Sequence, residues 1–345
     1  MTVSKRFILL TLVAMFCAFS LTGIVQPAEA APVVLKFAGQ NPPEHFATIS
    51  MNEIAKEVAQ KTNNRVQIKV FPANQLGDYS LVYEELIRGT VEMACISFPS
   101  QFDNRMDLIY VQGYTSSYEQ VANVYDPNGW FFKKMDEFNS RLGVKLLGMY
   151  LEGMVGIGTV KPMRAPLDPK VDKGLLLRIP NMDVFKTALE GAGFRTLSIP
   201  FADVYQSMQT GVCDGDTGYS IVAAYTTFGD VIKHWYNFNK NTECLGIMIS
   251  DKVWKKLSAE DRKVLQEAVS RQAALSITNA RANDQKYLDL MKKKGIQVHM
   301  YTPKELKPMM DAFAATWGQL DQSKGKALMD EFKKEMKKIS DAIAK

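Results

Sequence analysis

Residues 66–97 of the chain have the sequence VQIKVFPANQLGDYSLVYEELIRGTVEMACIS. The first six, Val66 to Phe71, alternate apolar and polar side chains, which is typical of a half-buried strand. Apolar residues between Leu81 and Leu86 then recur at the spacing of a helix, which Gly89 ends. Val91 to Ser97 indicates a second strand. The stretch therefore predicts a strand, a crossover helix and a strand.

The residues before this stretch extend the same pattern. Val33 to Ala38 predicts a strand, and Ile49 to Lys61 carries the apolar stripe of a helix. The resulting order of strands and helices is typical of a parallel sheet with crossover helices. We therefore expect an α/β fold.

The pattern occurs a second time further along the chain, with strands at 175–179 and 195–199, helices at 184–189 and 201–209, and a strand from Val212. A short similarity between two segments of the sequence accompanies the repeated pattern. Val82-Tyr83 precedes Gly89-Thr90-Val91-Glu92 by seven residues, and Val204-Tyr205 precedes Gly211-Val212-Cys213-Asp214 at the same spacing. Sequence similarities as short as this one also arise by chance. Together with the repeated order of elements, however, it favours two similar α/β lobes.

The C-terminal third is predicted to be helical. Ser258 to Asp261 resembles a capping box, and the apolar period that follows persists to about Met291 without glycine or proline. A single helix of that length measures about 45 Å at about 1.5 Å per residue, which is enough to bridge both lobes. Beyond it we expect a strand at 296–301 and a capped helix from Thr302.

The first thirty residues have the layout of a secretory signal peptide. Lys5 and Arg6 precede the uncharged run Phe7 to Ile24, and an A-x-A pattern ends at Ala30. An uncleaved membrane anchor is the alternative, because about 18 apolar residues nearly span a bilayer. The A-x-A pattern favours cleavage after Ala30, which would give an exported, soluble chain of residues 31–345.

Composition narrows the class of protein. The chain has 345 residues, which suggests two domains, and its net charge of +5 comes without a long basic block, so nucleic acid is not the expected partner. Outside the signal peptide it has three cysteines, Cys95, Cys213 and Cys244. An oxidising compartment permits one disulfide, and pairing of Cys213 with Cys244 stays open. Buried free thiols are the favoured interpretation.

Motifs for catalysis or cofactor binding are missing from the sequence. The three histidines are far apart, no nucleophile elbow or phosphate-binding loop occurs, and the G-x-G triplets lack their third glycine. Asp214 to Gly218 begins like a calcium loop, but Tyr219 and Tyr225 stand where that loop needs Gly and Glu. We therefore expect no enzymatic activity, no metal and no cofactor.

A candidate binding residue remains. Arg178 lies near the end of the apolar strand 175–179, and small ligands bind at strand ends in the clefts of α/β proteins. An arginine there can form a bidentate, charge-assisted bond with a carboxylate. A salt bridge at a domain surface is the alternative role.

Four segments of the sequence occur in an order that characterises one family. They are Leu35-Lys36-Phe37-Ala38 with Asn41-Pro42-Pro43, Phe71 to Asp78 (FPANQLGD), Gly174 to Pro180 (GLLLRIP), and Pro200 to Tyr205 (PFADVY) with Gln209 to Val212 and Asp214-Gly215. In these segments, and over essentially the whole exported chain, the protein resembles the solute-binding proteins of tripartite ATP-independent periplasmic (TRAP) transporters.

The resemblance implies a periplasmic binding protein of the type II-like class, in which two α/β lobes close around an organic acid and a long helix spans both. Lobe I would hold residues 31–152 and 245–283, and lobe II residues 153–244 and 284–345. It further implies that Arg178 holds the ligand carboxylate, that Phe201 lines the pocket, and that Gln40 and Ser97 are pocket positions.

The sequence departs from the family pattern around the pocket. Members commonly continue D-G with Q-E-N-P, and their asparagine contacts the ligand, whereas Gly218 stands at that position here. Asp216, Thr217 or Tyr219 would then supply the contact. The arginine of a G-x-R motif that would form a second carboxylate clamp is missing, and Asp203 replaces a usual glutamate. These differences favour a monocarboxylate, hydroxylated or aromatic, between Phe201 and Tyr219.

The resemblance therefore implies a monomeric receptor that captures a small organic acid and delivers it to TRAP membrane subunits. A sensing protein of a chemoreceptor or kinase system would have the same lobes and a different docking partner. An exported α/β enzyme is the second alternative, which the missing catalytic motifs disfavour.

Overall fold

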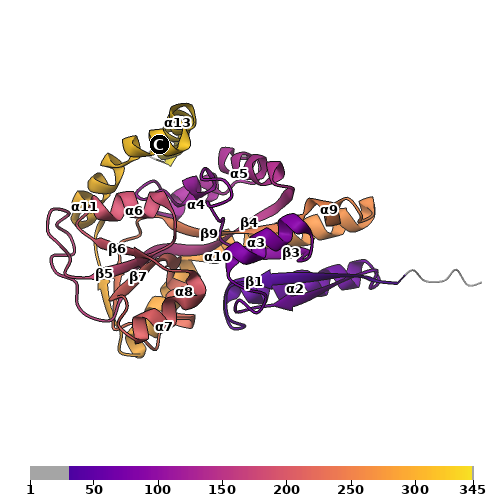
Figure 1. The fold of residues 1–345 in the computed structure, drawn as a ribbon, viewed down its shortest axis with the longest axis horizontal. Helices are drawn as coiled ribbons and strands as arrows, with labels where there is room; N and C mark the ends of the chain where they lie inside the picture. Colours follow the sequence, from indigo (N-terminus) through magenta and orange to yellow (C-terminus); the bar gives the residue numbers. More distant parts are fainter. Residues whose placement is uncertain (1–30, 344–345) are drawn as a thin grey trace, which may run out of the picture.

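The computed structural model describes residues 31–343, so the predicted signal peptide lies outside the described residues. The strands follow the order β2-β1-β3-β9-β4-β7-β5-β6, with β8 paired to β4 and β10 paired to β8. Figure 1 shows β1, β3 and α2 on one side of the molecule and β5, β6 and β7 on the other, with β4 and β9 between them.

The first strand group confirms the predicted parallel β-α-β-α-β unit. Strand β1 (Val33–Gly39) pairs in parallel with β2 (Val66–Phe71) and β3 (Met93–Ile96), and α2 (Phe46–Lys61) and α3 (Tyr79–Arg88) connect them. Gly89 ends α3 in the left-handed conformation at φ 83°, as its position in the sequence predicts. Strand β9 (Thr242–Ser250) then adds antiparallel to β3.

The second strand group repeats this arrangement. Strand β5 (Leu176–Ile179) pairs in parallel with β6 (Arg195–Ser198) and β7 (Gly215–Ser220), and β7 is antiparallel to β4. Its helical segments are α6 (Asp183–Glu190), η2 (Phe201–Asp203), α7 (Val204–Gln209) and α8 (Ile221–Thr226). The order β2-β1-β3 followed by an antiparallel strand is thus matched by β6-β5-β7 followed by an antiparallel strand.

One boundary in this group differs from the prediction. Strand β7 begins at Gly215, and Val212 is half exposed in the turn before it. The amide of Val212 donates to the carbonyl oxygen of Ser207 at 2.9 Å, so the chain is still completing the end of α7 at that point.

Strand β4 (Val144–Thr159) joins the two groups and was not recognised in the sequence. Residues 144–154 pair with β9, and residues 155–159 pair with β7 and with β8 (His234–Asn237). The register shifts between Leu146 and Gly148, between Leu151 and Gly153, and between Val155 and Ile157. Strand β10 (Gln297–Met300) pairs in parallel with β8. β4 therefore links the two groups both along the chain and through its hydrogen bonds.

The predicted long helix is α10 (Ala259–Lys293), with 35 residues. The Ser258 hydroxyl caps it by accepting the Asp261 amide at 3.0 Å. The helix packs against β4, against α2 of the first strand group and against α8 of the second. It therefore spans both halves of the molecule.

The remaining helices cover the sheet and its edges. They are η1 (Met106–Tyr110), α4 (Tyr118–Val124), α5 (Trp130–Arg141), α9 (Asp251–Trp254), α11 (Pro303–Ala315), η3 (Trp317–Gln319), α12 (Leu320–Lys324) and α13 (Lys326–Ile343). Helix α13 returns to α4 and α5, where the Phe332 ring contacts those of Tyr114 and Phe131 (Figure 1).

Cys95, Cys213 and Cys244 are buried free thiols, which confirms the favoured interpretation over a disulfide. Within residues 31–343, no helix has both the length and the apolar character needed to cross a bilayer. Over the same range, no three His, Cys, Asp or Glu side chains are grouped so that they would hold a metal ion.

Candidate ligand-binding site

A cavity lies where the ends of the strands in the two groups meet. Its atom-free space is about 290 Å³, including the part that opens to solvent. The lining side chains come from both groups and combine aromatic walls with three polar groups. They are Tyr79, Ser97, Tyr110, Arg178, Pro180, Met182, Phe185, Phe201, Gly218 and Glu243.

Arg178 lies on β5 and is 1% exposed. Its Nε donates to the carbonyl oxygen of Ile199 at 2.8 Å, and its Nη1 donates to Asp216 Oδ1 at 3.3 Å. The Phe201 ring centroid lies 5.9 Å from the guanidinium carbon, within range of a cation–π contact. These contacts fix the plane of the guanidinium, while Nη2 has no hydrogen-bond partner among the described residues.

Asp216 on β7 is the counter-ion of Arg178 and is fully buried. Burial raises the pKa of its carboxyl group to about 7, although the neighbouring charges of Arg178 and Lys240 lower it. Within residues 31–343 its Oδ2 atom has no hydrogen-bond partner. Asp216 therefore orients the arginine and, when ionised, offsets part of its positive charge.

A chain of hydrogen bonds reaches the cavity from the first strand group. The Gln40 Nε2 donates to the Ser97 hydroxyl at 3.2 Å, and Gln40 Oε1 accepts the Ser97 amide at 2.9 Å. The Ser97 hydroxyl donates in turn to Glu243 Oε1 at 2.9 Å. Ser97 and Glu243 line the cavity, and Gln40 supports Ser97 from behind.

The other residues singled out in the sequence lie in different surroundings. Phe201 lines the cavity and packs edge-on against Phe228. Thr217 is buried and donates to the carbonyl oxygen of Gly156 at 2.7 Å.

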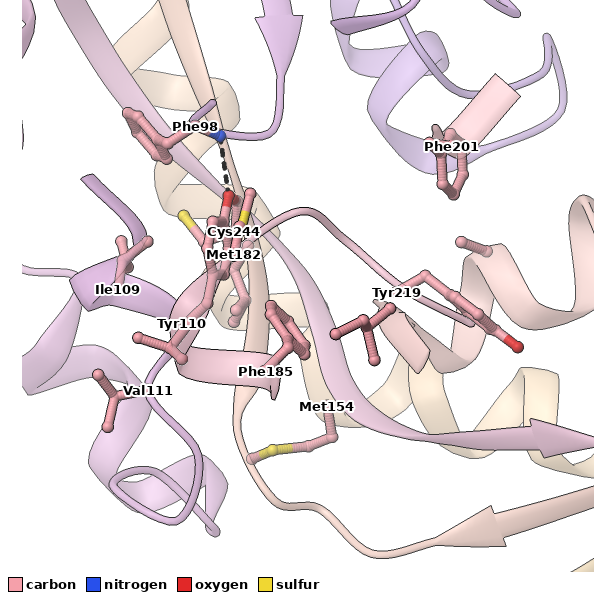
Figure 2. Packing of buried hydrophobic residues seen from close by; sticks show 14 of the residues in the cluster. Phe98, Ile109, Tyr110, Val111, Met154, Met182, Phe185, Phe201, Tyr219 and Cys244 are labelled. Carbon is pink, nitrogen blue, oxygen red and sulfur yellow. Dashed lines mark hydrogen bonds between the residues drawn. The ribbon is translucent and has the colours of Figure 1, made fainter. Parts of the chain in front are cut away.

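The Tyr219 ring packs against Phe228 and Trp235, at centroid distances of 4.7 and 6.0 Å. Figure 2 shows Tyr219 directed away from Tyr110, Met182 and Phe185. Of the residues singled out in the sequence, Arg178, Phe201 and Ser97 thus line the cavity, Gln40 and Asp216 hydrogen-bond to lining residues, and Thr217 and Tyr219 lie outside the lining.

Sequence reasoning missed the charged groups behind the cavity. Glu243 lies on β9 and Glu152 on β4, both in buried strands, and burial raises the pKa of each carboxyl group, to about 7 for Glu152. Lys240 is also buried, which lowers its pKa to about 7, and its Nζ donates to Gln112 and Asn241. For Glu152 and Glu243 the available signal was a single charged residue within or next to an apolar run, since such a residue is almost never fully buried without a partner. Lys240 stands in a polar stretch that gave no such signal.

The arrangement of these side chains is suited to binding a small molecule that carries a carboxylate. A fixed guanidinium beside aromatic walls offers paired donors to a planar carboxylate, and a low-dielectric surrounding strengthens that attraction. The neighbouring acids and the serine add hydrogen-bonding groups for the remainder of a small polar molecule.

Comparison with known proteins gives consistent results. The sequence profile of the bacterial extracellular solute-binding proteins of family 7 (DctP) matches residues 37–324. The C4-dicarboxylate-binding periplasmic protein DctP of Vibrio cholerae is 26% identical over 323 residues, which cover 91% of this chain and 93% of that protein.

Two solved structures share the fold. The sugar acid-binding protein DctPAm of Advenella mimigardefordensis, in complex with galactonate, superposes with a TM-score of 0.82 at 18% identity, over 89% of this chain and 99% of that one. A TRAP periplasmic solute-binding protein of Shewanella oneidensis with bound succinate gives a TM-score of 0.79 at 22% identity, over 89% and 100%. The predicted two-lobed α/β fold is confirmed by these similarities.

Proposed function

The chain belongs to the bacterial extracellular solute-binding proteins of family 7, and we propose that its Arg178 binds the carboxylate of a small organic acid in the cavity between the lobes. It is a periplasmic solute-binding receptor of the TRAP type. The bound acid is handed to the membrane subunits of the transporter. The observation that carries the assignment is a buried, oriented arginine in a cavity lined by both strand groups.

The ligands of the related structures agree with this assignment. Galactonate and succinate, bound to the Advenella and Shewanella proteins, are both carboxylates. In this chain Arg178 presents Nη2, and the open side of Nη1, to such a group. Phe201 and Phe185 enclose its carbon skeleton. Exclusion of water by closure strengthens the arginine–carboxylate attraction relative to its value in solvent.

The lobes are proposed to move about the segments that cross between the strand groups. Residues 31–152 and 245–283 form most of lobe I, and residues 153–244 and 284–325 form lobe II. The point at which β4 changes partners, from β9 to β7 and β8 after Met154, marks the hinge. Helix α13 packs on α4, and its Phe332 contacts Phe131 of α5, so we place α13 with lobe I and not with lobe II as expected from the sequence. A ligand that contacts both lobes favours the closed form, which the transporter recognises.

The receptor performs no chemistry on its ligand. Several polar groups at the cavity hold one another in place by hydrogen bonds, such as Ser97 with Glu243 and Arg178 with Asp216. Recovery of the ligand unchanged after prolonged incubation is the expected outcome, and a new product in that incubation would contradict this part of the proposal.

A thermal-shift screen tests the assignment. The protein, purified from the periplasm after export, is heated with a broad panel of carboxylates and with their primary amides as neutral analogues. A ligand at about 100 times its dissociation constant adds about 2.7 kcal/mol of stability. We expect stabilisation by one class of carboxylates alone. Stabilisation by the amides as strongly as by the acids, or by no carboxylate at all, would overturn the proposal.

A further inference from the structure

A carboxyl group faces the cavity together with Arg178. Glu243 belongs to β9, whose other residues are mostly apolar, and it is 2% exposed. Its side chain lines the same cavity as the arginine. A buried acid is costly unless hydrogen bonds satisfy it, so its partners indicate what it does.

The protein satisfies only one oxygen of this group. Glu243 Oε1 accepts from the Ser97 hydroxyl at 2.9 Å, and Gln40 holds Ser97 through two hydrogen bonds of its own. The Oε2 atom has no hydrogen-bond partner among the described residues. The nearby ammonium of Lys240 is engaged by Gln112 and Asn241 instead. The glutamate is therefore fixed in place, and when ionised it has one oxygen free to accept a hydrogen bond from another molecule.

The cavity is surrounded by ionisable side chains of both signs without a ligand. Asp216 pairs with Arg178 at 3.3 Å, and Lys240 attracts both Asp216 and Glu243 electrostatically. When Glu243 and Asp216 are ionised, they repel a ligand that brings only a negative charge. A ligand that also carries a hydrogen-bond donor relieves that repulsion by bonding to Glu243.

We infer that Glu243 is a specificity-determining residue, which selects carboxylates that also carry a hydroxyl or ammonium donor. This inference rests on the proposed function, because Arg178 must hold the carboxylate for the donor to face Glu243. A hydroxyl and an ammonium share the donor chemistry. They differ in charge, so a change of Glu243 to an uncharged side chain distinguishes them.

The experiment uses matched sets of acids that differ at one carbon. The 2-hydroxy, 2-amino and unsubstituted forms of butyrate and of 3-phenylpropionate are compared by thermal shift and calorimetry. The comparison also includes the carboxylate that stabilises the protein most in the thermal-shift screen, together with an analogue of it that lacks the donor group. The wild-type protein is expected to bind a donor-bearing form at least about 10-fold more tightly than its donor-free form, as one hydrogen bond to a charged group provides.

Glu243→Gln is the informative variant, since glutamine keeps an acceptor for Ser97 and removes the charge. It should lower the affinity for a 2-amino acid by about 30-fold or more, and for a 2-hydroxy acid by only about 3- to 10-fold. Glu267→Gln, an exposed glutamate of α10, is the matched control and should change neither.

The possible results distinguish a failure of the proposed role of Glu243 from a failure of the proposed carboxylate receptor. Binding of carboxylates with equal affinity whether or not a donor is present contradicts the role of Glu243 and leaves the receptor assignment standing. Absence of binding by any carboxylate of the panel overturns both. The wild-type comparison needs no variant, so equal affinities there would contradict the inference even if Glu243→Gln does not fold.

Discussion

Arg178 Nη1 lies 3.3 Å from Asp216 Oδ1, and the two side chains are 1% and 0% exposed. The arginine assigned to the ligand thus already has a buried counter-ion. Burial raises the pKa of Asp216 to about 7, so near neutral pH this carboxyl group exists in both protonation states. The positive charge available to a ligand therefore depends on whether Asp216 carries its proton.

The first prediction concerns the pH dependence of binding. Asp216 is neutral below about pH 7 and negative above it, and Lys240, with a pKa lowered to about 7, loses its positive charge over the same range. Both changes disfavour an anion as pH rises. Affinity for a carboxylate should therefore fall between about pH 6 and about pH 8, measured by calorimetry.

Asp216→Asn should flatten that pH dependence and bind the carboxylate more tightly at about pH 8. It should also lower the ligand-free melting temperature, because removing one partner leaves the buried Arg178 charge uncompensated. An unchanged pH profile in the variant would show that Asp216 does not modulate the arginine.

The second prediction concerns Glu152, which accepts hydrogen bonds from Asn41 and Ser220 in the two strand groups. Burial raises its pKa from 4.5 to about 7. A carboxyl group with a raised folded pKa stabilises the fold fully below its unfolded pKa, and this contribution is lost as pH rises through the folded pKa.

Glu152→Gln removes the titrating group and keeps the acceptor. The unfolding free energy of wild type, relative to the variant, should fall by about 3 kcal/mol between about pH 4.5 and about pH 7. Urea unfolding at several pH values measures this difference. A constant difference would mean that Glu152 titrates normally.

The third prediction tests the close packing at the junction of the groups. A Cβ at Gly156 of β4 would lie 2.5 Å from the Trp235 ring and 2.6 Å from the carbonyl oxygen of Tyr236. Gly156→Ala should therefore destabilise the protein by about 1–3 kcal/mol. Gly318→Ala is the control, since a Cβ there has no neighbour among the described residues within 4 Å. Equal melting temperatures for both variants would contradict this packing.

The fourth prediction concerns the thiols. Cys95, Cys213 and Cys244 are buried, and burial raises the pKa of each thiol, to about 11 for Cys213. A protonated, enclosed thiol reacts slowly. Mass spectrometry should find no alkylation of the three by iodoacetamide in the native protein and full alkylation after denaturation. A mass lower by about 2 Da, with two thiols unreactive in denaturant, would reveal a disulfide.

Much of the fold was predictable from the sequence because local patterns determine its parts. The strand–helix repeats, Gly89 and the caps at Ser258 and Thr302 each have a local physical cause, and the structure confirms them. Strand β4 was missed because it is buried along its whole length, so it lacks the alternation that marks a half-buried strand. Its pairing partners also lie far away in the sequence.

The site was predictable only in part. Arg178 was found from its place at the end of an apolar strand, and Gln40, Ser97 and Phe201 from the family resemblance. The pairing of Arg178 with Asp216 depends on the alignment of β5 with β7, which sequence spacing does not specify. Glu243 comes from β9, and only the tertiary fold places that strand beside Ser97.

The most direct measurement is a calorimetric titration of the best carboxylate from the screen into wild type, Arg178→Lys and Arg195→Lys. Lysine keeps the charge but loses the paired donors of the guanidinium. Arg195 is an exposed arginine on the neighbouring strand β6. Arg178→Lys should bind about 30-fold more weakly or worse, equivalent to about 2 kcal/mol, while Arg195→Lys binds like wild type. Wild-type affinity in a folded Arg178→Lys variant would contradict the account.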